Sequence, residues 1–458
     1  MRWWRFLPAP VSLAALLAAL VLGATPATPA RAGTIEVGSA QVTSSDPTAV
    51  TFTARVTSSS GLRSAKLEYK VLNPDGNIGG SGDAAFSTGR ESDISFTLET
   101  KTPTRYIPVG SDLVYRWVLT DNDGVTAGSE EQTYRFLDAR YQWQSRTEGP
   151  VTVYWYGNDD RNATVALTAT RTALEQIGAL LRTAVPYPTK VIVWRSEAEG
   201  ELAMQSRGAV FDSQVLTGGQ RVAPDLLFVF EPDADVIRHE TAHIVTHVAG
   251  DGPFSSIPAW LDEGTAVYAQ SSPGGGYTTG VQFAIQSDQT IRLRSLQSPA
   301  NDPSLVNVFY GQSWSTVAFM IDRYGEEKFA EIFRLVREGS RVDDALMAAI
   351  GLDQDGLYNA WREANGLAVK DFGPIASGTT VAGAVATRAP LGIPTGSGSS
   401  SGGGRANSAP TPAASSGDGS AAAAGGGSSG AALAVGGITV LLAVLLGGAG
   451  VYLLRRRA

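Results

Sequence analysis

The chain has only three histidines, and all of them lie in one short stretch. His239 and His243 stand four positions apart in the motif His-Glu-Thr-Ala-His, with Glu240 directly after the first histidine. On a helix, such residues differ by about 40° in direction and ~6 Å in rise, so both imidazoles can reach one ion. The pattern is typical of a zinc site in which the glutamate is the general base.

The third histidine, His247, repeats the same spacing. On a straight helix it lies about 12 Å along the axis from His239, which is too far to share an ion with ligand bonds of about 2 Å. We therefore assign His247 to packing or to support of the site. The alternative for His239 and His243 is a pair of helix histidines that hold no metal. Glu240 between them and Glu263 downstream count against it.

The histidine motif, followed by Trp-Leu-Asp-Glu-Gly at residues 260–264, resembles the gluzincin metallopeptidases. Their peptidase-MA-like members and the aminopeptidase N group are the most similar, over roughly residues 150–370. In that superfamily the glutamate of the second segment is the third zinc ligand. The resemblance therefore implies one Zn²⁺ ion held by His239, His243 and Glu263.

The resemblance also implies a chemistry. A zinc with three protein ligands keeps one open position, at which water becomes a nucleophile near neutral pH. Glu240 would deprotonate this zinc-activated water and pass the proton to the leaving amine. In the aminopeptidase group a tyrosine that heads a later helix stabilises the oxyanion, and Tyr310 stands in a similar place. The alternative for Tyr310 is a core tyrosine at a helix start.

Two departures from the relatives affect specificity and support of the site. Aminopeptidases carry Gly-Ala-Met-Glu-Asn, whose acid binds the free amine of the substrate, whereas residues 208–212 place Phe211 at that position. We therefore expect an endopeptidase that acts on a peptide or protein, bound in extended form along this strand. Thermolysin-like relatives orient one zinc histidine with an aspartate where Val267 stands, so the partner that orients His239 or His243 is not assigned.

The elements that must position these residues follow from hydrophobic periodicity. The site helix is expected to begin at Asp233 and to end near Gly250. Before it, strands are expected at residues 141–156, 190–194, 208–211 and 226–230, with helices at residues 164–181 and 196–204. After it, a flexible loop is expected at residues 273–277, and helices at residues 310–324, 326–338, 342–350 and 355–364. We predict an α+β gluzincin-like domain over residues 141–373, helical in its C-terminal half.

Residues 33–140 show a different pattern. Short runs of alternating β-formers are separated by turn sequences such as Asn-Pro-Asp-Gly at 73–76 and Asp-Asn-Asp-Gly at 121–124. This spacing predicts an all-β sandwich of immunoglobulin or fibronectin type, and without cysteine it has no disulfide. The segment carries no catalytic pattern. We expect a spacer or docking module, with a possible surface partner.

The two ends predict the location. Residues 1–32 have the arginines, apolar run and small-residue cleavage site of a signal peptide; an uncleaved anchor is the alternative. Residues 374–430 form a linker rich in Gly, Ser, Ala and Pro, and residues 431–454 are an uncharged stretch long enough for a transmembrane helix. The basic tail at residues 455–458 places that end in the cytoplasm. We expect a single-pass membrane protein whose catalytic domain is extracytoplasmic.

The composition restricts the partners. A net charge of −8 provides no basic patch, so no nucleic acid is expected. The favoured function is a membrane-anchored extracytoplasmic zinc metallopeptidase. A cell-surface binding or assembly protein with little or no catalysis, which recognises its target through the sandwich, is the first alternative. Hydrolysis of a non-peptide substrate is the second, because one gluzincin relative also hydrolyses an epoxide.

Overall fold

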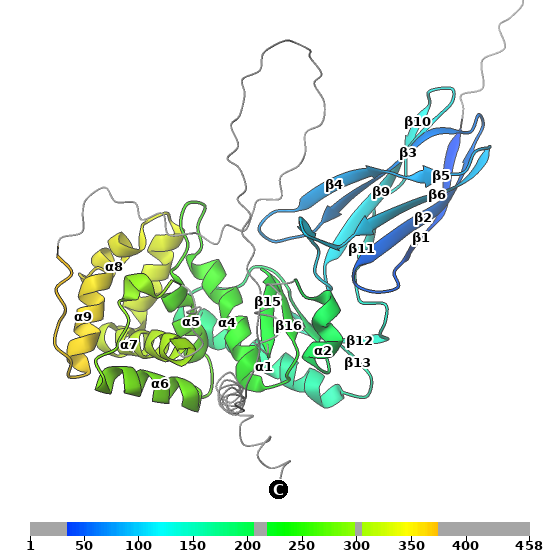
Figure 1. Cartoon of the computed structure of the whole chain (residues 1–458). Coiled ribbons are helices and arrows are strands. Elements are labelled where there is room, and N and C mark those ends of the chain that lie inside the picture. The colour runs from blue at the N-terminus through cyan, green and yellow to red at the C-terminus, as the bar shows by residue number, and fades with distance from the viewer. Residues whose placement is uncertain (1–33, 206–217, 298–304, 374–458) are drawn as a thin grey trace, which may run out of the picture.

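The computed structural model describes residues 34–205, 218–297 and 305–373 (Figure 1). The predicted signal peptide, linker, transmembrane helix and basic tail lie outside these residues, as does the strand expected at 208–211. Among the helices of the described residues, none has the length and apolar character needed to cross a membrane.

The N-terminal part consists of two antiparallel sheets. The first has the order β1-β2-β6-β5, formed by Ile35–Thr43, Ala49–Ser58, Glu91–Glu99 and Ala85–Phe86. The second has the order β10-β9-β3-β4, formed by Thr126–Gly128, Asp112–Asp121, Leu62–Val71 and Ile78–Asp83, and β11 (Gln132–Arg135) also pairs with β9. A short hairpin joins β7 (Lys101–Thr102) to β8 (Arg105–Tyr106).

The alternation of the strands explains why these sheets pack face to face. Val50, Phe52 and Ala54 of β2 are buried, while the residues between them are more exposed. The Phe52 ring lies 4.7 Å from that of Tyr115 on β9 in the other sheet. A period of two with one buried face is what a two-layer sandwich requires. The immunoglobulin or fibronectin topology stays a prediction.

A third sheet follows, with the order β12-β13-β14-β16-β15. Its strands are Trp143–Glu148, Val151–Tyr156, Thr189–Val193, Leu226–Val229 and Gly219–Ala223. The three central strands are parallel, and the edge strands β12 and β15 are antiparallel to their neighbours. One face of this sheet packs against α1 (Asp160–Leu180) and α4 (Ala234–Gly250). The short helices α2 (Glu197–Gly200) and η1 (Glu201–Ala203) follow β14.

The other face of this sheet packs against the sandwich. Ile192, Trp194 and Phe228 belong to the same hydrophobic core as Phe52 and the other sandwich residues. At the edge of this contact the buried Lys190 ammonium lies 2.9 Å from Asp225 and 3.3 Å from Asp112, which begins β9. The sandwich and the third sheet therefore share one core.

The C-terminal half is helical and lies beyond the third sheet as seen from the sandwich (Figure 1). Its elements are α5 (Ala259–Tyr268), α6 (Gly275–Gln286), η2 (Leu293–Ser295), α7 (Val306–Arg337), α8 (Val342–Ile350) and α9 (Gln354–Ala364). The predicted order, β-rich first and helical last, is confirmed. The break expected between two helices is a kink at Gly325 in α7, where φ is 84°.

The expectation of a flexible loop at residues 273–277 is wrong, because α6 begins at Gly275. Two of its glycines, Gly276 and Gly280, are positions of close contact with α7. A Cβ atom at Gly280 would lie 2.8 Å from the backbone of Asn307 in α7. Consecutive glycines indicate a loop in sequence, but here the helix begins among them.

Candidate metal centre

Helix α4 carries the two histidines of the motif. The Asp233 carboxylate accepts hydrogen bonds from the backbone N–H groups of Asp235 and Val236, so it caps the helix as its position predicts. Ile237 and Ile244 pack toward the sheet, while Ala242 and Val245 pack toward the helical half. This packing on two sides fixes the rotation of α4 about its axis.

Helix α5 brings the third candidate ligand. Trp260 and Leu261 are fully buried, and the Trp260 indole N–H donates to Gln354 on α9. A Cβ atom at Gly264 would lie 2.5 Å from the backbone oxygen of Ser313, so α5 approaches α7 directly at this glycine. The neighbouring Glu263 is thereby held against α4.

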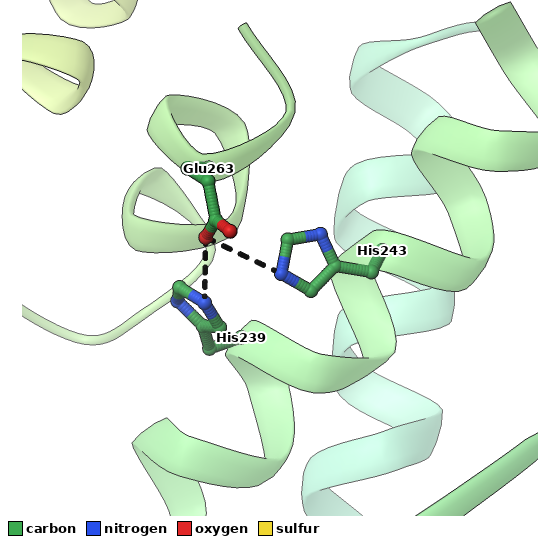
Figure 2. A group of neighbouring side chains, drawn as sticks. All are labelled: His239, His243 and Glu263. Carbon is green, nitrogen blue, oxygen red and sulfur yellow. Dashed lines mark ion pairs between the residues drawn. The ribbon is translucent and has the colours of Figure 1, made fainter. Parts of the chain in front are cut away.

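The structure brings His239, His243 and Glu263 together (Figure 2). One ligand atom from each lies within 4.8 Å of the others. Glu263 Oε2 is 3.2 Å from His239 Nε2 and 3.5 Å from His243 Nε2. Each side chain is less than one-fifth exposed. The three donors therefore face one point between α4 and α5.

The electrostatics of the cluster favour a cation at this point. Burial opposes the charged form of Glu263, but the adjacent His243 and His239 hold its pKa well below the usual range. Burial likewise opposes the charged form of His243, and the carboxylates of Asp262 and Glu263 nevertheless hold its pKa well above the usual range. A bound dication would satisfy the same carboxylates that otherwise stabilise a proton on His243.

The donor set also fits a metal chemically. Glu263 Oε2, the atom that faces both histidines, is buried without a hydrogen-bond partner among the described residues. Two imidazoles and one carboxylate on facing helices match the ligands that catalytic zinc takes. The residues present therefore fit a single zinc ion.

Asp262 is the residue at the site that the sequence left without a role. Its Oδ1 lies 2.9 Å from His243 Nδ1, the ring nitrogen on the far side from Glu263, and it accepts a hydrogen bond from the Thr246 hydroxyl. Consecutive helix positions differ by about 100°, so Asp262 reaches one edge of the ring while Glu263 faces the other. Asp262 is thus the orienting partner of His243.

Glu240 follows His239 on α4, and β15, the edge strand of the third sheet among the described residues, holds it. The backbone N–H of Arg221 donates to Glu240 Oε2 at 3.0 Å. A Cβ atom at Gly219 would lie only 2.9 Å from Glu240 Cγ. Strand β15 was not predicted, although the pair Gly218 and Gly219 marks a close backbone approach that could have indicated it.

Tyr310 lies in the second turn of α7, next to the cluster. Its ring centroid is 6.1 Å from that of His239. Burial raises the pKa of its hydroxyl well above the usual value, and the negative charge of Glu263 adds to the shift. Tyr310 is therefore a neutral hydrogen-bond donor beside the site over the physiological pH range.

His247 stands apart from the three ligands. Its Nδ1 lies 2.7 Å from Asp251, and its Nε2 lies 3.0 Å from Asp75 in the β3–β4 turn of the sandwich. Both ring nitrogens thus face carboxylates outside the cluster. In the structure His247 joins the end of α4 to the sandwich.

Comparison with known proteins supports a peptidase. Residues 223–365 match the model of the Peptidase MA superfamily, and this segment includes α4 and α5 with all three candidate ligands. No curated protein matches the chain. A crystal structure of catalytically inactive OgpA from Akkermansia muciniphila, in complex with an O-glycopeptide, is 10% identical with a TM-score of 0.18. That match covers 23% of this chain and spans 30% of the other.

Proposed function

We propose that this protein is a zinc metallopeptidase that cleaves peptide bonds. The observation that carries the proposal is the convergence of His239, His243 and Glu263, while Glu240 follows His239 on the same helix with its carboxylate held by the Arg221 N–H. A structural zinc normally takes four protein ligands and has no use for a neighbouring base. Three ligands among the described residues, with a further carboxylate that is not a ligand, are the arrangement of a hydrolytic site.

The roles of the residues follow from their placement. Zinc, when bound, would polarise the peptide carbonyl and make water a stronger nucleophile at neutral pH. Glu240 takes a proton from the attacking water and delivers it to the leaving amine. The Arg221 N–H keeps that carboxylate in place. Tyr310 donates a hydrogen bond to the carbonyl oxygen as negative charge develops on it.

The edge strand favours an extended peptide as substrate. β15 ends the third sheet, and it carries the Arg221 N–H that contacts Glu240. A substrate strand added at this edge would bring its backbone to the catalytic carboxylate. Since Phe211 replaces the amine-binding acid of the aminopeptidases, we propose an endopeptidase. The predicted signal peptide and transmembrane helix would place it outside the cytoplasm, anchored to the membrane.

The test is a peptide-library digest by the full chain in detergent, beside the variant Glu240→Gln, with zinc content measured on both. We expect one zinc per chain in both proteins, internal cleavage by the wild type, and loss of at least about 10³-fold in kcat/KM in the variant. Removal of zinc by a chelator should abolish cleavage, and zinc should restore it. If both proteins hold zinc and neither cleaves, a binding or assembly role replaces catalysis. If the wild type holds no zinc, the ligand assignment is wrong.

A further inference from the structure

A second tyrosine lies at the site beside Tyr310. Tyr277 is in the first turn of α6, and its ring stacks on that of Tyr310 with centroids 5.1 Å apart and planes 27° from parallel. The centroid of the Tyr310 ring in turn lies 6.1 Å from that of the His239 ring. The two tyrosines therefore form a continuous stack that reaches the candidate zinc ligands.

Glycines at the contact between α6 and α7 fix this stack. A Cβ atom at Gly311 would lie 2.1 Å from the backbone oxygen of Tyr277, and one at Gly276 would lie 3.0 Å from the Asn307 side chain. No side chain fits at Gly311 without separating the two helices. The backbone of Tyr277 thus rests directly on α7, one residue beyond Tyr310.

The two hydroxyl groups are available to a ligand. Within the described residues, neither the Tyr277 nor the Tyr310 hydroxyl is in a hydrogen bond, and both side chains are partly exposed. Burial raises the pKa of Tyr277, and the charges of Glu263 and Glu240 raise it further. The Tyr277 hydroxyl is therefore a neutral donor at neutral pH.

We propose that Tyr277 is a second catalytic hydrogen-bond donor, which contacts the scissile carbonyl oxygen of the substrate together with Tyr310. The inference rests on the peptidase function proposed above. Two hydroxyl groups can donate hydrogen bonds to the same oxyanion, as paired N–H groups do in oxyanion holes. The competing role is purely one of packing, in which the Tyr277 ring only keeps Tyr310 in position.

Two substitutions separate these roles. Tyr277→Phe keeps the ring and removes the hydroxyl, whereas Tyr277→Leu removes the aromatic ring as well. We expect Tyr277→Phe to lower kcat/KM by about 10- to 100-fold, mainly through kcat, with zinc content unchanged. Tyr268→Phe, at the exposed end of α5, is the matched control and should be neutral. If Tyr277→Phe keeps the kcat/KM of the wild type while Tyr277→Leu lowers it, the proposal is overturned and Tyr277 has only a packing role.

A binding measurement keeps the test independent of turnover. N-phosphoryl-Leu-Trp has a tetrahedral anionic phosphoryl group, and its affinity for the zinc-loaded full chain can be measured by calorimetry. We expect Tyr277→Phe to weaken this affinity about tenfold, and the double variant with Tyr310→Phe to weaken it further. If the wild type cleaves no peptide but binds this compound in a Tyr277-dependent manner, the peptidase proposal fails and the donor pair stands. If Tyr277→Phe binds like the wild type, or if the wild type does not bind, the donor pair is refuted.

Discussion

The neighbouring residues Asp262 and Glu263 have different roles at the candidate metal centre. Glu263 faces the Nε2 atoms of both histidines, whereas Asp262 faces only Nδ1 of His243. The Asp262 carboxylate, 2.9 Å from Nδ1, favours a proton on that nitrogen, which leaves Nε2 for a metal. Its own orientation is fixed by the Thr246 hydroxyl.

Substitution of Asp262 should therefore act on metal affinity. We expect Asp262→Ala to weaken zinc binding by about 10- to 100-fold, because His243 loses the partner that orients it. Competition with a chromophoric chelator measures the effect. Asp322→Asn, an exposed position on α7, is the control and should bind zinc like the wild type. Equal affinities of wild type and Asp262→Ala would mean that packing alone orients the ring.

At this scale the sequence predicts residues that belong to one local motif. His239, Glu240 and His243 are related by helix geometry alone, and Glu263 follows from the second segment of the resemblance. Asp262 and Tyr277 gain their roles from packing between separate helices, which no local spacing encodes. Their positions follow only from the contacts of α4 with α5 and of α6 with α7.

Strand β15 acts on the site through its backbone. It passes so close to α4 that Gly219 has no room for a side chain beside Glu240 and Val236. Two residues later the Arg221 N–H holds the Glu240 carboxylate. The strand therefore positions the base even before any substrate adds to its edge.

We expect Gly219→Ala to displace Glu240 and to lower kcat/KM about tenfold or more, because small misplacements of a catalytic group are costly. Zinc content should stay the same, since the three ligands do not contact the new methyl group. Gly79→Ala in β4 is a matched control, because its Cβ would have only an ordinary 3.8 Å contact. Full activity in Gly219→Ala would show that the strand gives way and does not position the base.

Periodicity predicts the elements with regular buried faces, such as β2, α1 and α4. Periodicity fails where close packing depends on a glycine, because glycine has no side chain. The glycines at the start of α6 indicated a loop, and the apolar pattern gave no sign of β15, which begins at Gly219. In both places the absent side chain is the structural feature, and a pattern of apolar residues cannot show it.

At the scale of the whole molecule, His247 links the site helix to the sandwich. It lies between Asp251 on its own helix and Asp75 in the β3–β4 turn, with Arg221 of β15 also nearby. The hydrogen bond to Asp251 raises the pKa of His247 above its usual 6.5, against burial and the positive charge of Arg221, and Asp75 adds to the rise. A raised folded-state pKa means that this stabilisation is complete below about pH 6.5 and is lost as pH rises through the folded pKa.

The contact between domains should therefore depend on pH. We expect Asp75→Asn to lower the free energy of unfolding by less than about 1 kcal/mol below pH 6, since Asp75 is half exposed, and to have no effect at alkaline pH. Urea unfolding at several pH values measures this difference. Asp123→Asn, in the turn after β9 at the opposite end of the second sheet, is the control. If the difference in unfolding free energy between Asp75→Asn and the wild type does not change with pH, the charged form of His247 does not contribute to this contact.

The relation between the two domains could not be predicted from the sequence. The runs that form β14 and β16 have buried residues on both faces, as any central strand does. Nothing in them shows that Ile192 and Phe228 face a sandwich formed by residues far earlier in the chain. The sequence predicted a spacer or docking module, and it gave no sign of the core that this module shares with the third sheet.

That shared core has a consequence for cooperativity. If the sandwich unfolded alone, it would expose the apolar face of the third sheet to water. This exposure costs free energy, so unfolding of one part destabilises the other. Although multidomain proteins commonly unfold in steps, the two parts here should melt in one transition with equal calorimetric and van't Hoff enthalpies. Two resolved transitions in a scanning calorimeter would contradict this. Cooperative unfolding would also mean that damage to the sandwich, far from any catalytic atom, abolishes the site with it.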